Sequence, residues 1–287
     1  MPAQQDELDV TAISEVVGED LINLLFEKAP RKVASRIGKA IDHYNKSLRL
    51  LNVDDEMGAI RLIAAEEELV VAIFEWLKLK SDQFPEHRDF VRRFKNHQVK
   101  LAFYPVFSQF RFILADMAEG FVPEGLDDSE GWNATMACQN NHVDLVIKDG
   151  NGTEIIRVNP FSISISRDDL PHDEVIEEMY RDFEREVDRQ HNVPVRQFVT
   201  FRSDFRNKLL YAEDSGMWQM GETLEQLLDT NFKTTLRDLL WALGALVCNE
   251  PLQANFGLVA QFVSLYRRVL AEAVDTRLAA APEGGST

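Results

Sequence analysis

The stretch from Phe84 to Phe112 reads FPEHRDFVRRFKNHQVKLAFYPVFSQFRF and predicts one long helix. Its first half contains Arg92 and, five residues later, His97. Its second half is rich in aromatic residues, and Pro105 within it predicts a kink or a split, because proline lacks the N–H that the helix ladder needs. A mainly helical protein is therefore predicted around this element.

Apolar residues at helical spacing predict three more helices before this stretch, at residues 11–28, 31–51 and 56–80. Thr11 is the expected N-cap of the first, and Pro30 ends it. The second helix begins with an excess of basic residues, namely Arg31, Lys32, Arg36 and Lys39. The N-terminal part of the chain is thus predicted to be a helical bundle.

Beyond a loop predicted at residues 119–134, the pattern changes from helical to alternating. Strands are predicted at His142–Lys148 and Glu154–Val158, joined by a turn at Asp149–Gly152. The second of these strands is expected to resume at Phe161–Ile165, after an interruption at Pro160. Residues Val195–Phe201 are a candidate third strand. Further helices are expected from Asp168 to Gln190, from Thr223 to Leu246 and from Gln253 to Val274.

These patterns predict an α+β protein that is predominantly α. An N-terminal helical bundle is followed by a small antiparallel sheet and C-terminal helices. The expected division is a helical module at residues 1–120, an α+β part at 121–278 and a disordered tail at 279–287.

Charge and composition restrict the class of protein. The chain has 48 acidic and 31 basic residues among 287, for a formal net charge of -17, so it repels nucleic acid at long range, although a small basic site on an acidic body is compatible with this. No apolar run approaches the roughly 18–20 residues that span a bilayer, and the polar start does not resemble a signal peptide. Cys138 and Cys248 lie far apart. A cytoplasmic protein with no membrane segment is expected.

The order of the helices resembles the HEPN superfamily, helical domains of bacterial RNA-cleaving toxins and abortive-infection defence proteins. The resemblance covers about residues 31–117. It rests on the break at Asn52–Asp55, on the helix that begins at Met57 and contains Glu66–Glu68, and on the stretch from Arg92 to His97. The family signature is an arginine, usually a polar residue next, then a histidine. This chain has Arg93 where asparagine or aspartate is commoner.

The resemblance implies metal-independent RNA cleavage, with His97 as acid/base and Arg92 or Arg93 as phosphate clamp. Cleavage through the 2′-hydroxyl needs a group that titrates near neutral pH, which histidine supplies, and a cation for the phosphate, which arginine supplies in forked geometry. On a continuous helix Arg93 and His97 would face the same way. The family also implies a homodimer that pairs two such helices into one site without a cofactor or metal.

Glu67 lies on the apolar stripe of its helix, between Ile63 and Val70, where an apolar residue is expected. A buried carboxylate must find a partner or shift its pKa. Glu67 either supports His97 or Arg93 from a neighbouring helix, or forms a structural ion pair with Lys39, Arg36 or Arg93.

Other patterns in the chain compete with the Arg92–His97 stretch. Arg185 and His191 form a second Arg–His match, on a charge-dense helix whose acidic flanks would repel phosphate. Incidental metal ligands could be sought among two groups that lack the paired spacing of a metal site: His142, Asp144 and His172, and Asp127, Asp128 and Glu130. The sequence contains no phosphate-binding glycine loop, no nucleophile elbow and no His-Glu-x-x-His.

Two functions therefore remain open. The first is a HEPN-like protein that cuts RNA in stress or phage defence, as a homodimer. The second is a non-catalytic helical interaction protein whose acidic surface binds a partner with a basic surface. The first predicts a basic cleft around His97. The second predicts that His97 is buried or isolated from any groove.

Overall fold

The computed structural model describes residues 8–83, 87–88, 90, 96–119, 132–159, 164–166, 170–211, 219–249 and 257–273. It contains two compact units, each drawn from two separate stretches of the chain. The first unit comprises Met1–Trp76 and Asp204–Cys248, and the second comprises Leu77–Ser203 and Asn249–Thr287. The predicted division of the sequence near residue 120 stays a prediction.

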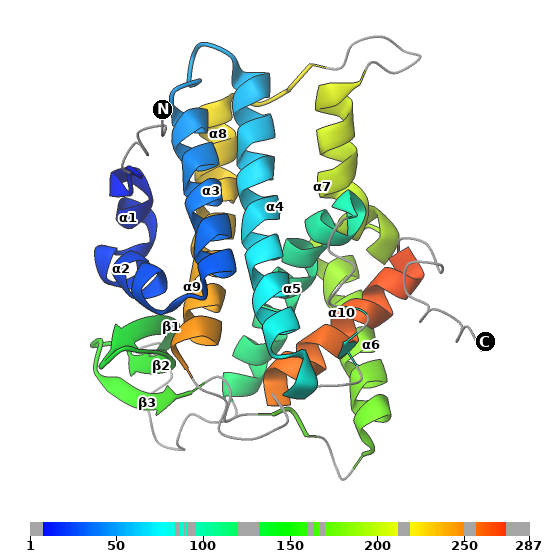
Figure 1. Cartoon of the computed structure of the whole chain (residues 1–287). Helices are drawn as coiled ribbons and strands as arrows, with labels where there is room; N and C mark the ends of the chain where they lie inside the picture. The colour runs from blue at the N-terminus through cyan, green and yellow to red at the C-terminus, as the bar shows by residue number, and fades with distance from the viewer. Residues whose placement is uncertain are drawn as a thin grey trace, which may run out of the picture. The chain divides into compact units, whose positions relative to one another are not determined.

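The fold is predominantly α with one small antiparallel sheet, which confirms the predicted fold class (Figure 1). The first unit contains α1, α2, α3, most of α4, α8 and α9. The bounds of its helices are α1 Thr11–Val17, α2 Glu19–Lys28, α3 Arg31–Leu48, α4 Asp55–Leu79, α8 Leu224–Leu227 and α9 Lys233–Cys248. A π-helical turn, Leu228–Phe232, joins α8 to α9. Within this unit α1 and α2 pack on α9.

The first predicted helix is in fact two helices, because Gly18 interrupts it with φ +90°. A positive φ is strained for residues with a Cβ, and glycine adopts it readily. Asp9, rather than Thr11, provides the N-terminal side-chain acceptor, since its Oδ1 receives the backbone N–H of Thr11 at 3.0 Å. α2 ends at Lys28, just before Pro30, as the sequence predicts.

The start of α8 is hydrogen-bonded to the start of α4. Thr223 and Gln226 form a reciprocal capping box, and the N–H of Leu224 donates to Asp55 at 3.2 Å. The fully buried Leu224 side chain lies over Gly58, where an added Cβ would meet Leu224 Cδ2 at 2.1 Å. Gly58 therefore permits a close approach that any larger residue would block.

We expect Gly58→Ala to lower the free energy of unfolding by about 1–3 kcal/mol, because overpacking against Leu224 outweighs alanine's better helix propensity. Gly38→Ala, in α3, is the matched control. Its Cβ would meet Leu8 at an ordinary 3.6 Å, so stability should rise by up to about 1 kcal/mol. Urea unfolding of both variants checks this. Equal effects of the two substitutions would contradict it.

The second unit contains α5, a three-stranded sheet, α6 and α10. Its elements are α5 His97–Glu119, β1 Trp132–Gln139, β2 His142–Asp149, β3 Glu154–Val158, α6 His172–His191 and α10 Gly257–Ala273. α5 packs on α6 and α10, and α10 also packs on α6. α6 packs through one apolar edge, since Val175, Met179, Phe183 and Val187 are all buried. α7, Val195–Leu210, crosses the division between the units.

The sheet has the order β1-β2-β3 with both pairs antiparallel. β2, β3 and the turn at Asp149–Gly152 confirm the prediction, with Asp149 Oδ1 accepting the N–H groups of Asn151 and Thr153 at 3.0 and 2.7 Å. The prediction of a third strand at Val195–Phe201 was wrong, because those residues belong to a helix. The third strand is β1, and its first three residues lie within the loop predicted at 119–134.

The β1–β2 hairpin turns through Asn140 and Asn141, which have φ +51° and +62°. Two consecutive residues with positive φ are the mark of a tight two-residue hairpin turn, and asparagine tolerates this conformation. Adjacent asparagines are therefore the local sequence signal for this hairpin and for β1. The predicted strand at Phe161–Ile165 lies partly outside the described residues, and residues 164–166 are not a strand.

The predicted helix from Phe84 to Phe112 was wrong at its start. α5 begins at His97, after residues 87, 88 and 90, which are described and not α-helical. The local cause is Asn96, whose side-chain oxygen accepts the backbone N–H of Gln98 at 2.8 Å, an N-cap interaction. The helix runs through Pro105 to Glu119, so the proline does not split it.

The aromatic residues of α5 pack within the chain. Phe103, Phe107 and Phe110 contact the ring of Phe262 in α10 at centroid distances of 5.2, 5.7 and 5.2 Å, and Phe103 also contacts Tyr266. Phe103 and Phe110 are buried, so these aromatic side chains give no support for a second copy of the chain.

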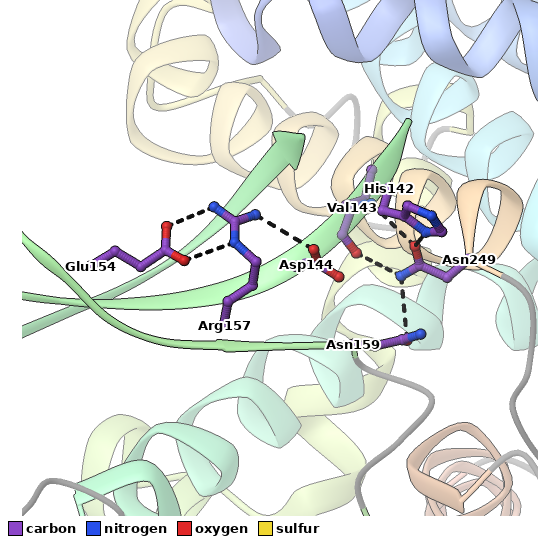
Figure 2. Close-up of polar contacts among 7 residues, drawn as sticks. All are labelled: His142, Val143, Asp144, Glu154, Arg157, Asn159 and Asn249. Carbon is purple, nitrogen blue, oxygen red and sulfur yellow. Dashed lines mark hydrogen bonds and ion pairs between the residues drawn. The ribbon is translucent and has the colours of Figure 1, made fainter. Parts of the chain in front are cut away.

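Two side-chain amides hold the second unit together by bridging backbone groups. The Asn249 amide accepts from the N–H of Val143 at 3.2 Å and donates to its carbonyl at 2.7 Å (Figure 2). The Gln261 amide does the same for Ile165, at 2.8 and 2.6 Å. All four residues are buried. At Val143 in β2 the Asn249 side chain makes the two hydrogen bonds that a neighbouring β-strand would make.

Among the helices that the structure describes, none combines the length and the apolar character needed to cross a membrane.

Candidate functional site

His97 is exposed and is the first residue of α5. Arg92 and Arg93 lie outside the described residues, so the structure places one of the three predicted catalytic side chains. Because α5 begins at His97, it does not supply the one-turn spacing between Arg93 and His97 that a continuous helix would give. Lys100, about one turn further along α5, is buried.

Glu67 is buried and forms an ion pair with Arg206 of α7, with Arg206 Nε at 3.6 Å from Oε1. The two predicted partners on α3 pair with other carboxylates. Arg36 contacts Glu68 at 2.9 Å, and Lys39 contacts Asp42 at 2.8 Å. The sequence could not indicate Arg206, because it is 139 positions away and comes close only through the fold. A supporting role of Glu67 for His97 stays a prediction.

The second Arg–His match contributes to helix packing. Arg185 pairs with Asp182 one turn earlier on α6. The ring of His191 stacks on Phe198 of α7 with centroids 4.7 Å apart, and its Nε2 lies 3.3 Å from the Gln109 amide. These two residues are thus engaged with their neighbours in α5, α6 and α7.

Two of the three residues in the first metal-ligand group have other partners, as Figure 2 shows. Arg157 forms a forked pair with Glu154 at 2.8 and 2.7 Å and reaches Asp144 at 3.5 Å. His142 Nδ1 lies 3.3 Å from Asn249 Oδ1. Asp127, Asp128 and Glu130 lie outside the described residues. Within the described part of the chain, no cluster of three or more His, Cys, Asp or Glu side chains could hold a metal ion.

A third Arg–His pair, absent from the sequence motifs, comes together between α3 and α4. Arg61 Nη1 lies 3.3 Å from His43 Nδ1, and since a guanidinium can only donate, the imidazole nitrogen accepts. Burial first, and then the charges of Lys39 and Arg61, lower the pKa of His43 from its usual value. His43 is therefore held as a neutral imidazole with Nε2 as its protonated nitrogen.

Lys39 and Lys46 flank this pair on α3 and both bind Asp42, at 2.8 and 2.9 Å. The Lys39 hydrogen bond is the main cause that lowers the pKa of Asp42 to about 2. The sequence signal for this cluster was the basic start of the helix at 31–51, which pointed to no particular chemistry on its own.

A shallow hollow of about 310 Å³ lies along α7, lined by Asp204, Asn207, Lys208 and Tyr211. Its lining does not include His97, the histidine of the proposed motif. The predicted basic cleft around His97 therefore stays a prediction. The alternative expects His97 to be buried or isolated from any groove, and of these two only burial is excluded, because His97 is exposed.

Comparison of the chain with protein-family models, with curated proteins and with solved structures finds no match. The function is therefore argued from the sequence motif and the geometry.

Proposed function

We propose that the chain is a HEPN-like protein that cuts RNA without a metal ion, with His97 as the acid/base and Arg92 or Arg93 as the phosphate clamp. The observation that supports this is the position of His97, exposed at the first residue of α5, where a substrate can reach it. The histidine of the other motif match, His191, is stacked on Phe198 instead.

The chemistry assigned to these residues is transfer within the RNA strand. The 2′-oxygen attacks the adjacent phosphorus, the bond to the 5′-oxygen breaks, and a cyclic phosphate and a 5′-hydroxyl result. Imidazole takes the 2′-hydroxyl proton or supplies the leaving-group proton, because its pKa lies near neutral. A guanidinium stabilises the negative charge that builds on the phosphate oxygens.

We include a homodimer in this proposal, because the family resemblance implies that two copies contribute one motif each to a site. A dimer also places a second arginine and a second histidine near the phosphate, so that one imidazole can act as base and the other as acid. Sedimentation of the purified chain tests this part separately from activity.

We expect the purified wild-type protein to cut single-stranded RNA in the presence of a chelator, and His97→Ala to reduce the rate by about 10²–10⁴-fold. His172→Ala is the matched control, because His172 is also exposed and is also the first residue of a helix, α6. Circular dichroism and sedimentation should match for all three proteins. Equal rates for wild type and a folded His97→Ala protein would refute the assignment.

The alternative is a non-catalytic protein that binds a basic partner, and α6 favours it. This helix has eight carboxylates and three arginines, and most of them lie on its exposed face. Absence of cleavage by wild-type protein, together with capture of a lysine-rich peptide that is lost on neutralising Glu174 and Glu178, would establish the alternative instead.

A further inference from the structure

α3 has a line of exposed and partly exposed side chains, four cations and one neutral imidazole, here called the α3 basic row: Lys32, Arg36, Lys39, His43 and Lys46. Successive members are four or three residues apart, so they share one face of the helix, and the row is about 21 Å long at 1.5 Å per residue. The side chains of Arg36, Lys39 and Lys46 are 43%, 50% and 44% exposed.

The charge of α3 contrasts with the charge of the chain. Five cations and one carboxylate between Arg31 and Leu48 give this helix a formal charge of +4, whereas the whole protein has -17. A local positive field on an acidic body selects where a polyanion can approach, because the remaining surface repels it. The α3 basic row is such a place, and nothing in the proposed reaction at His97 uses it.

α4 lies antiparallel beside α3 and extends the row (Figure 1). The contacts Arg36–Glu68 and Arg61–His43 mark the seam between the two helices. Arg61 of α4 lies beside the row and is a fifth cation next to its four. The neutral His43 presents Nε2–H as a further donor. Glu68 offsets one of these charges.

Asp42 lies within the row and holds the ammonium groups of both Lys39 and Lys46. Its carboxylate stays ionised throughout the physiological range, since its pKa is lowered to about 2. Asp42 therefore competes with any external anion for the same two lysines. Replacing Asp42 should therefore change the affinity of the row for an anion.

We propose that the α3 basic row binds the phosphate backbone of an RNA strand, without reading its sequence. Backbone binding needs a line of cations and releases counterions from the nucleic acid. Recognition of an acidic protein would also need apolar or aromatic anchors at the centre of the contact. The described positions of α3 that are exposed include no Phe, Tyr, Trp or Met, and Tyr44 is buried.

The choice of RNA as the ligand rests on the proposed function, but the experiment tests the row separately from His97. It uses the full chain with His97→Ala, so that no RNA is cut. It measures the binding of a fluorescent single-stranded uridine oligonucleotide over a range of salt concentrations. In this background Lys39→Ala with Lys46→Ala should weaken binding roughly tenfold and lower the slope of log K against log salt by about 1.4. Asp42→Asn should strengthen binding severalfold, because it releases both lysines.

Lys28→Ala with Lys233→Ala is the matched control, since these lysines also pair with carboxylates, Glu27 and Asp229, and lie outside α3. It removes the same charge and should leave binding unchanged. Equal weakening by both double substitutions, or none by either, overturns the proposal. Binding of polyglutamate but not RNA overturns it in favour of an acidic protein partner. Absence of cleavage by wild-type protein refutes only the role of His97.

Discussion

Asn249→Ala is expected to destabilise the second unit by about 3 kcal/mol, which is large for a single polar side chain. Asn249 is buried, and its amide satisfies both the N–H and the carbonyl of Val143, which is fully buried in β2. Without it both backbone groups lose their partner in a place that water cannot enter. Each buried unsatisfied group costs about 1–3 kcal/mol.

The sheet gives Asn249 this role because β3 ends at Val158, opposite Leu145. Two residues further along the chain is Pro160, which has no N–H and could not extend the ladder. Val143 points its N–H and carbonyl to the same side as Leu145, since residues two apart in a strand do so. The Asn249 amide provides the donor and the acceptor there.

Urea unfolding measures the loss, and hydrogen exchange of the Val143 amide localises it. We expect that amide to exchange much faster in Asn249→Ala while amides in α3 keep their protection. His142→Ala is the control, because His142 touches the same amide oxygen at 3.3 Å but is exposed, and should cost less than about 1 kcal/mol. Unchanged protection of Val143 in Asn249→Ala would show that the amide bridge is not needed.

Gln261→Glu is expected to lower the free energy of unfolding at neutral pH by about 3 kcal/mol, as much as Asn249→Ala. In acid the variant should regain much of this stability. The Gln261 Nε2 group donates to the carbonyl of Ile165 at 2.6 Å. A carboxylate oxygen in its place would face that carbonyl as a second acceptor. Only the protonated acid could donate, so the folded protein should raise the pKa of the new carboxyl above the unfolded value of about 4.3.

The sign of the pH dependence follows from that shift. A raised folded pKa means that the protonated form stabilises the fold. This contribution is complete below the unfolded pKa and is lost as pH rises through the folded pKa. The stability of Gln261→Glu relative to wild type should therefore increase from pH 7 towards pH 4.

Gln139→Glu is the control for the added charge, since Gln139 is exposed at the end of β1. It should change stability by less than about 0.5 kcal/mol at either pH. Exchange of the Ile165 amide provides the local measurement. A Gln261→Glu protein as stable as wild type at pH 7, or one that weakens further in acid, would contradict the expected role of this amide.

The amino-acid sequence alone was enough to determine the fold class, most helices and two of the three strands. These features depend on periodicity and on local chemistry. Apolar residues at helical spacing predict α3 and α4, and the alternation around the Asp149–Gly152 turn predicts β2 and β3. Two features that the periodicity does not predict also have local signals, since Asn96 caps α5 and adjacent asparagines form the β1–β2 turn. The sequence did not show that His97 is exposed, because this depends on where α5 begins.

Only the tertiary structure decided which distant side chains meet. Glu67 pairs with Arg206, Arg61 donates to His43, and Asn249 bridges Val143. None of these contacts has a sequence signature, because the partners belong to different elements. Their approach depends on helix packing and strand register across the whole unit. The same reason applies to the aromatic face of α5. It is covered by α10, which lies some 150 residues further along the chain, so the sequence pattern of α5 alone could not show that this face is packed within the chain.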